Sequence, residues 1–406
     1  MAAAVAFITL PFVGSILPSL TRSLARPAGI DNDGIHTSPV TFRGLPGIAL
    51  AVSFTMFYVV IYFGDRLTIA GTSVQHVLQK SLYSLLDPIS LIMRGAPSDQ
   101  WFFYGTVYTA AILAFGLRMI IKYRHSRYQI IRTVSVMGFQ LFFAYLIPSL
   151  LSLFKQPAFY FSYFWPLKPE YLYPYKWAEL AGRGIQTPGF WFLAFALIMT
   201  FVATPVLTYF LGKRWYCSWV CGCGGLAETM GDPFRHLSNK SLPVWKFERW
   251  IVHGILAAII VITILLWINS ATSGTIFGQA SALLAEWYGF YIGAIFSGVV
   301  GVGFYPILGS RVWCRFGCPM AAYLGIIQKY FSRFRITTNG GQCISCGNCS
   351  TYCEMGIDVK WYAQRGQDIV RSSCVGCGIC SAVCPRGVLK LETGPVSSRR
   401  VWEIGV

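Results

Sequence analysis

The sequence contains few charged residues for its length. Only 12% of its 406 residues are Asp, Glu, Lys or Arg, against about 25% in an ordinary soluble domain, and 55% are hydrophobic. The mean hydropathy of +0.54 and the long uncharged runs exclude an ordinary soluble globular protein, because each membrane-spanning helix needs about 20 apolar residues. The composition therefore indicates a multi-span membrane protein.

Cysteine and histidine are unevenly placed or scarce. No cysteine occurs in the first 216 residues, and all 13 lie in tight clusters after them, which is typical of metal ligation rather than of a disulfide framework. Of the five histidines, His253 alone falls within a predicted span. A bis-histidine haem inside the membrane needs two such residues, so the sequence argues against one.

Apolar runs predict six membrane spans, at residues 47–64, 101–121, 130–154, 190–212, 250–269 and 287–309. The apolar residues 1–20 lack a basic region and a cleavage site, so we expect a seventh span or an interfacial helix there rather than a signal peptide.

Basic residues predict the orientation of these spans. They gather in the connections 118–132 and 213–249 and after residue 309, whereas 270–286 has none. Because Lys and Arg are retained on the cytoplasmic side, every cysteine is expected at the cytoplasmic face. The net charge of +17 follows these membrane-flanking connections, so no nucleic-acid partner is expected. The external connection 155–188 is rich in aromatic residues and proline, which suits an interfacial belt, or a platform for an outer partner or a quinone head group.

Two identical cysteine runs follow the last span. Both read C-x2-C-x2-C-x3-C: Cys343, Cys346, Cys349 and Cys353, then Cys374, Cys377, Cys380 and Cys384. In bacterial two-cluster ferredoxins three thiolates of each run hold one [4Fe-4S] cluster and the fourth crosses to the other. Cluster one is therefore assigned to Cys343, Cys346, Cys349 and Cys384, and cluster two to Cys374, Cys377, Cys380 and Cys353. Structural zinc is the alternative, which the repeated four-cysteine runs disfavour.

Residues around these runs suit a cluster. Gly347, Gly376 and Gly378 permit a close approach of backbone amides to the sulfurs. Glu354 follows the first run where the second has Pro385, and its charge would lower the potential of that cluster if the side chain points inward.

The other five cysteines stand beside two spans and form an internal repeat. Cys217, Cys221 and Cys223 follow span 190–212, and Cys314 and Cys318 follow span 287–309; both motifs read G-x-R-x-aromatic-C-x3-C, 97 residues apart. If each motif continues its helix, cysteines at i and i+4 share one face, and two helices can direct four thiolates to one point. Arg214 and Arg311 would favour thiolates or simply anchor the chain at the cytoplasmic face. The five cysteines fit a further iron or iron–sulfur centre, a redox-active or metal-handling thiol pair, or plain packing.

One ionisable residue within a span is a candidate for proton transfer. His253 lies near the cytoplasmic end of its predicted helix. It either hydrogen-bonds a neighbouring helix or exchanges a proton with a quinone, with Glu228 or Glu248 as the outlet.

The combination of two membrane-edge cysteine motifs and a two-cluster ferredoxin run resembles the membrane polyferredoxins of periplasmic nitrate reduction and nitrous-oxide respiration, with oxidase-assembly polyferredoxins as relatives. The resemblance covers about residues 190–392. Cys318-Pro319 matches the C-x3-C-P of that family, whereas Cys221 is followed by Gly222 and Cys223. The resemblance implies a bacterial cytoplasmic membrane protein that passes electrons between the quinone pool or cytoplasmic donors and a respiratory enzyme, with other subunits of a membrane redox complex as partners.

We therefore expect an all-α polytopic bundle of six or seven spans with a small C-terminal α+β ferredoxin domain. The expected units are an N-terminal segment 1–46, a bundle 47–324, a linker 325–342, a two-cluster domain 343–392 and a tail 393–406. The expected function is that of an electron-transfer subunit with two [4Fe-4S] clusters rather than of a complete enzyme. The alternatives are a maturation reductase that supplies electrons to a metal such as copper, and a membrane anchor whose clusters are structural.

Overall fold

A computed structural model of the chain describes residues 44–69, 71–182 and 184–394. Six helices in this part are long and apolar enough to cross a membrane: Leu45–Phe63, Gln100–Lys122, Arg127–Leu153, Pro188–Leu211, Leu242–Ala271 and Ala280–Gly303. They correspond to the six predicted spans, so the expectation of a mostly helical chain with six membrane-length apolar helices is confirmed. The expected additional helix within residues 1–20 lies outside the described residues.

Three of the six spans contain π-helical turns. The third consists of α6 (Arg127–Leu141), η2 (Phe142–Leu146) and α7 (Ile147–Leu153), and the fourth of α9 (Pro188–Ile198), η4 (Met199–Ala203) and α10 (Thr204–Leu211). In both, the π turn precedes a proline, Pro148 or Pro205. Proline donates no hydrogen bond and clashes with the carbonyl four residues earlier, so the widened turn falls where the regular pattern cannot be kept. The sixth span consists of α14 (Ala280–Tyr288), η6 (Gly289–Val300) and α15 (Gly301–Gly303).

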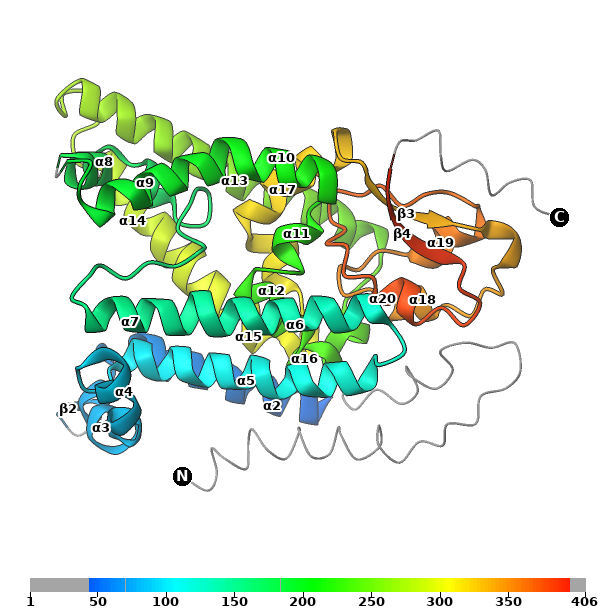
Figure 1. Cartoon of the computed structure of the whole chain (residues 1–406), viewed down its shortest axis with the longest axis horizontal. Coiled ribbons are helices and arrows are strands. Elements are labelled where there is room, and N and C mark those ends of the chain that lie inside the picture. Colours follow the sequence, from blue (N-terminus) through cyan, green and yellow to red (C-terminus); the bar gives the residue numbers. More distant parts are fainter. Residues whose placement is uncertain (1–43, 70, 183, 395–406) are drawn as a thin grey trace.

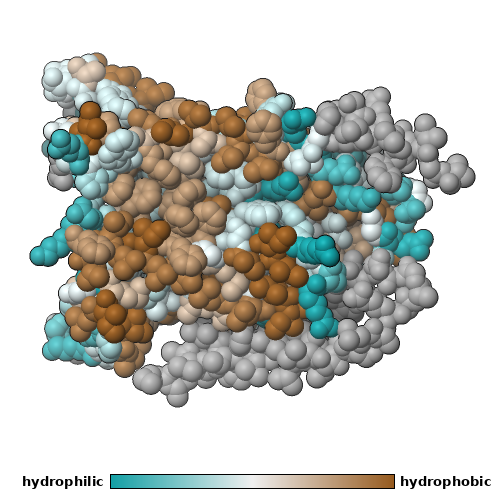
Figure 2. Space-filling view, viewed as in Figure 1, coloured by the Kyte–Doolittle hydropathy of each residue, from teal (hydrophilic) through white to brown (hydrophobic). Residues whose placement is uncertain are grey.

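The surface of the bundle is apolar around its middle. Figure 2 shows hydrophobic side chains over the helices on the visible face and hydrophilic ones toward both ends of the long axis. Large apolar side chains such as Met56, Phe142, Phe201 and Val261 point outward. This distribution is expected for helices whose outer faces contact lipid.

Short elements gather at the two ends of the bundle (Figure 1). One end carries β1 (Thr68–Ile69), β2 (Thr72–Ser73), α3 (Val74–Ser81), η1 (Tyr83–Leu86), α4 (Asp87–Arg94), η3 (Pro169–Leu172) and α8 (Pro174–Ala181). The elements after the fourth and sixth spans are α11 (Arg214–Cys217), α12 (Gly222–Glu228), η5 (Asp232–Leu237), α16 (Tyr305–Leu308), η7 (Trp313–Gly317) and α17 (Pro319–Tyr330). The remaining three spans are α2 (Leu45–Phe63), α5 (Gln100–Lys122) and α13 (Leu242–Ala271).

The C-terminal module lies at the end opposite α3, α4 and α8 (Figure 1). It contains β3 (Phe334–Thr338), η8 (Gly340–Gln342), α18 (Asn348–Thr351), α19 (Val359–Gln364), α20 (Ile379–Ala382) and β4 (Leu389–Thr393). The two strands pair antiparallel, with Phe334 opposite Thr393 and Ile336 opposite Leu391. Residues 325–342, expected as a linker, thus contain the end of α17 and a paired strand. Phe334 and Ile336 are buried in the same core as Cys217 and Cys314, so this segment packs between the bundle and the module.

The connection 155–188 enters the bundle, which corrects the expectation of an interfacial belt for its central part. Phe164 is fully buried, and its ring centroid lies 5.5 Å from that of Tyr216, next to Cys217. The carbonyl of Trp165 accepts a hydrogen bond from Thr200 Oγ1 at 3.3 Å, within the fourth span. Non-helical backbone is tolerated at membrane depth only where protein surrounds it, and aromatic side chains supply that packing here.

Candidate metal centres

The two predicted ligand sets of the C-terminal module line two separate cavities. Cys353, Cys374, Cys377 and Cys380, the set assigned to cluster two, surround about 380 Å³ of empty space. Cys343, Cys346, Cys349 and Cys384, the set assigned to cluster one, surround about 350 Å³. The fourth cysteine of each run therefore lies with the other run, as the crossed ligand pattern requires.

The chemistry of the cluster-two thiols fits a metal. Burial raises the pKa of Cys374 to about 11 and that of Cys377 to about 12. These thiols therefore stay protonated at neutral pH unless a cation binds them, and a coordinating metal ion deprotonates such ligands outright. Backbone amides also face the sulfurs: the N–H of Ile357 donates to Cys353 Sγ at 3.4 Å.

The loop that carries cluster two is hydrogen-bonded to the membrane bundle. Four successive carbonyls accept side-chain hydrogen bonds: Cys374 from Gln328 Nε2 at 2.7 Å, Val375 from Ser218 Oγ at 2.8 Å, Gly376 from Tyr128 Oη at 2.8 Å and Cys377 from Gln129 Nε2 at 2.9 Å. The cysteine set assigned to cluster two therefore lies against the bundle. In the cluster-one set, Cys346 is exposed and Cys343 is half-buried, so the two cavities differ in their access to solvent.

The membrane-edge motifs do not continue their helices, which corrects the expected geometry. The fourth span ends at Leu211 before Gly212 with φ 71°, and α16 ends at Leu308 before Gly309 with φ 95°. Glycine adopts this left-handed conformation without steric penalty and ends a helix. The first glycine of each G-x-R motif thus turns the chain, and the cysteines lie on short turns beyond it.

These turns still bring the membrane-edge cysteines, Cys217, Cys221, Cys223, Cys314 and Cys318, to one place. Cys217, Cys314 and Cys318 are buried. Cys318 lies near enough to Cys217, Cys221 and Cys314 to interact electrostatically with all three, and Cys223 interacts with Cys314 and Cys318 in the same way. Burial raises the pKa of Cys217 to about 12, whereas a hydrogen bond from Cys223 lowers the pKa of Cys221 to about 7. The repeat therefore assembles one site from two distant segments, and the unmatched Cys223 lies beside Cys221.

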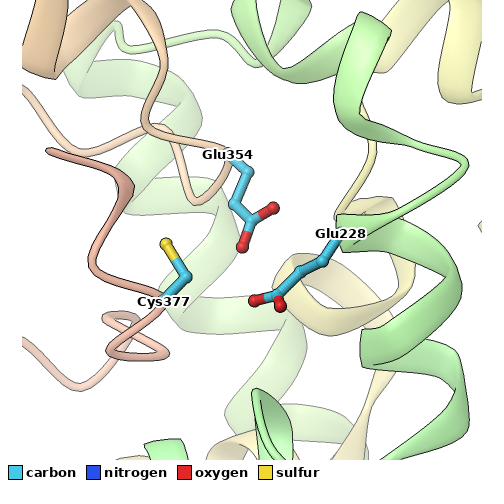
Figure 3. Close-up of side chains that lie close together, drawn as sticks. All are labelled: Glu228, Glu354 and Cys377. Atoms are coloured by element: carbon cyan, nitrogen blue, oxygen red, sulfur yellow. The ribbon is translucent and has the colours of Figure 1, made fainter. Parts of the chain in front are cut away.

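A layer of buried charge separates the membrane-edge cysteines from cluster two. Figure 3 shows Glu228, Glu354 and Cys377 converging, and their ligand atoms lie within 4.8 Å of one another. Arg311 pairs with both carboxylates, Arg132 with Glu228, and Arg235 with Glu354. Because three guanidinium groups already neutralise the two carboxylates, we interpret this group as an ion-pair network rather than as a metal site.

The same network continues through Asp232. Its carboxylate contacts Arg118 at 2.9 Å, Lys122 at 2.7 Å and Arg235 at 2.8 Å. We call the eight side chains together the charged layer: Arg118, Lys122, Arg132, Glu228, Asp232, Arg235, Arg311 and Glu354. The pKa of Asp232 is lowered because these cationic groups outweigh its burial.

Sequence reasoning did not identify the charged layer. Arg118, Lys122 and Arg132 appear in the sequence as basic residues of a cytoplasmic connection, yet Arg118 and Arg132 are buried. The available signal was the position of Arg118 and Arg132 inside apolar helices, since buried charge in such segments needs a partner. Glu354 does point inward, and it is paired with Arg235 and Arg311, so its negative charge acts on the neighbouring cysteine set together with two positive charges.

The candidate proton residues do not form one group. His253 and Glu248 line a pocket together with Cys314 and Lys213, and Glu248 is paired with Arg315 at 2.9 Å. Glu228 belongs to the charged layer, paired with Arg132 and Arg311. Of the two expected outlets, only Glu248 thus shares a pocket with His253.

Comparisons with known proteins match the cysteine-containing parts of the chain. A family described as a 4Fe-4S binding domain matches twice, at residues 193–241 and 289–338, and a 4Fe-4S dicluster domain matches residues 342–389. The "Putative electron transport protein YccM" of Escherichia coli (strain K12) is 27% identical over 181 residues, which cover 43% of this chain and 49% of that relative. The chain thus matches about half the length of this curated relative. No solved structure matches.

These findings support a coarse description. The chain carries 4Fe-4S binding domains and helices suited to a membrane, and part of it is similar to a putative electron transport protein. The double match of one family also agrees with the internal repeat, since each match contains one membrane-edge motif.

Proposed function

We propose that this chain is a membrane-bound iron–sulfur subunit, of the polyferredoxin type, that relays electrons between a donor or the quinone pool and a partner respiratory enzyme. The proposal rests on how the cluster-two loop is attached to the bundle. Four successive carbonyls of the loop accept hydrogen bonds from side chains of the bundle. The charged layer connects this loop to the membrane-edge cysteines. The partly exposed set of cluster one then faces a soluble partner, and the membrane-edge set faces the membrane.

The two cysteine sets of the C-terminal module would hold [4Fe-4S] clusters, which supply one-electron transfer. The chain itself positions and shields them. The four carbonyl bonds fix the loop of cluster two, and Cys374 and Cys380 are buried. An enclosed cluster next to the bundle and a partly exposed cluster beyond it are suited to successive steps of a relay.

We propose a third iron–sulfur centre at the membrane-edge cysteines. Among the described residues, no three of these five thiols lie within 4.8 Å of one another. Four thiolates on one zinc ion lie about 3.8 Å apart, given Zn–S bonds of about 2.3 Å. A cluster carries its thiolates on separate iron atoms, so the wider spacing favours it, as does the 4Fe-4S binding family that matches both motifs.

We propose that the C-terminal module faces the bacterial cytoplasm. The basic connection between α5 and α6 lies at the module's end of the bundle (Figure 1). Lys213 and Lys240 of the basic connection 213–249 donate hydrogen bonds to carbonyls of Ser372 and Thr351 in the module, and basic residues mark the cytoplasmic side.

Metal analysis of the anaerobically purified protein tests the proposal. Two cubanes require about eight irons per chain, and a reproducible excess is expected from the membrane-edge site. Cys314→Ser with Cys318→Ser should remove only the excess, whereas Cys346→Ser and Cys377→Ser should each remove one of the two cubane signals from the EPR spectrum. An iron-free protein, or one that binds zinc, would contradict the proposal.

A second candidate function is direct exchange with quinone at the pocket of about 290 Å³ that Cys314 and His253 line. The Nδ1–H of His253 donates to the carbonyl of Arg249 at 2.7 Å, which assigns the proton to Nδ1 and leaves Nε2 able to accept one. His253→Ala should then slow quinone-coupled turnover and leave the EPR signals intact. Unchanged turnover would exclude this site, and reduction of copper ions without quinone would support the metal-delivery alternative.

A further inference from the structure

The charged layer carries more positive than negative charge. Among the described residues that its ion pairs connect, five side chains are cationic and three are carboxylates. All are buried except Lys122, which is partly exposed. An uncompensated buried charge is expensive, so this excess indicates that an anionic group belongs beside the layer.

The groups that border the layer on both sides are cysteines. On the membrane side, Arg311 Nη1 lies 3.6 Å from Cys314 Sγ and 3.2 Å from the carbonyl of Cys217. On the other side, a Glu354 oxygen lies within 4.8 Å of Cys377 Sγ, and Glu354 directly follows Cys353. Thiolate-ligated iron–sulfur clusters are anionic, and nearby charge sets their potentials.

Arg311 is the residue that faces both sides. Its Nη1 faces Cys314, its Nη2 pairs with Glu228, and its Nε lies 3.0 Å from Glu354 Oε1. The corresponding arginine of the first repeat, Arg214, is placed differently: it lies over the rings of Phe334 and Tyr128. The repeat is therefore asymmetric in its arginines, and only the second one enters the charged layer.

We infer that Arg311 is a positioning residue shared by two redox centres: its guanidinium orients Cys314 and Glu354 and supplies positive charge that raises the reduction potentials of the membrane-edge centre and of cluster two together. This inference rests on the proposed iron–sulfur function. It explains why a cation and a carboxylate are buried between the two sites, since a negative charge gained by either centre is then placed next to a fixed positive group. Cluster one has no part in the layer and should not respond.

A potentiometric titration followed by EPR tests this inference on the full-length protein. Arg311→Gln should lower the potentials of cluster two and of the membrane-edge centre and leave that of cluster one in place. Arg311→Lys keeps the charge and should give a smaller shift. Glu354→Gln removes a negative charge and should raise the potential of cluster two, opposite in sign to Arg311→Gln. Lys329→Gln, which removes an exposed charge, is the matched control and should shift nothing.

The outcomes separate this inference from the proposed function. If the EPR signals are present and Arg311→Gln leaves all potentials in place, or shifts cluster one equally, the inference is wrong although the relay stands. If Arg311→Gln fails to fold, the other two variants decide. The inference is wrong if the reduction potential of cluster two is unchanged or lowered in Glu354→Gln. It is also wrong if Arg311→Lys, which keeps the positive charge, shifts the potentials by a large amount. Absence of the signals in the unmodified protein would instead contradict the proposed function.

Discussion

The contact between the cluster-two loop and the bundle can be tested by a pair of glycine substitutions. Gly347 and Gly378 occupy equivalent positions in the two cysteine runs, and both have positive φ, 83° and 74°. Their surroundings differ. A Cβ at Gly347 would meet nothing within 4 Å, whereas one at Gly378 would lie 2.8 Å from Cε1 of Tyr128 and 3.1 Å from Nε2 of Gln129.

The expected loss of stability has two contributions, the strain of a side chain at positive φ and the steric overlap of the added Cβ. An alanine in the left-handed region loses about 1–2 kcal/mol, and this term applies to both variants. Overpacking adds about 1–3 kcal/mol, and it applies only to Gly378→Ala, because the ring and amide that it meets belong to α6, which also holds the loop. Gly378→Ala should therefore destabilise the protein by about 1–3 kcal/mol more than Gly347→Ala.

Denaturation in detergent, followed by the EPR signal of each cluster, measures this difference. Gly378→Ala should release cluster two at lower denaturant, and Gly347→Ala should affect cluster one slightly. Tyr128→Ala combined with Gly378→Ala should recover part of the loss, as a double-mutant cycle would detect. Equal effects of the two glycine variants would refute the docking of cluster two on the bundle.

Two further predictions concern buried and capping carboxylates. Glu228→Gln removes the charge partner of the buried Arg132 and one of the two charge partners of Arg311, so it should lose about 3–5 kcal/mol in unfolding experiments. The exposed Glu286→Gln should stay within about 0.5 kcal/mol; equal losses would show that Glu228 is not buried with its partners. Asp99 caps α5, accepting from the N–H of Phe102 at 2.7 Å and pairing with Arg94, so Asp99→Ala should lose about 1–2 kcal/mol. Burial raises the pKa of Asp99, but the bonds from Arg94 and Phe102 outweigh it and hold that pKa below its ordinary value. The difference between wild type and Asp99→Ala should therefore persist from neutral pH down to about pH 4 and shrink as the pH falls further; a difference that shrinks already between pH 7 and 5 would contradict this.

The sequence was sufficient to predict the six long apolar helices and which cysteines of the C-terminal module lie together. A membrane-spanning helix can be predicted from its own apolar run, because in lipid each helix forms its backbone hydrogen bonds within itself. The ligand sets were equally accessible, since the spacing C-x2-C-x2-C-x3-C restricts which thiols can close around one cavity. The cavities lined by Cys353 with Cys374, and by Cys384 with Cys343, agree with that assignment.

Three features depended on the tertiary structure. The membrane-edge cysteines lie together although Gly212 and Gly309 end the preceding helices. Helical periodicity therefore predicted that these cysteines lie together, but the continuous helices on which that prediction rested are not present. Phe164 is fully buried although residues 154–168 around it form no helix or strand, which composition cannot reveal. The same composition favoured an interfacial belt.

The charged layer shows this limit most clearly. The sequence by itself shows that the charged residues Arg132, Glu228 and Arg311 stand near the ends of apolar segments. Only the packing of four separate segments decided that they pair with one another and with Glu354. The physical reason is range: apolar periodicity and ligand spacing act over a few residues, whereas a buried charge is neutralised by whichever opposite charge the fold brings within a few ångströms.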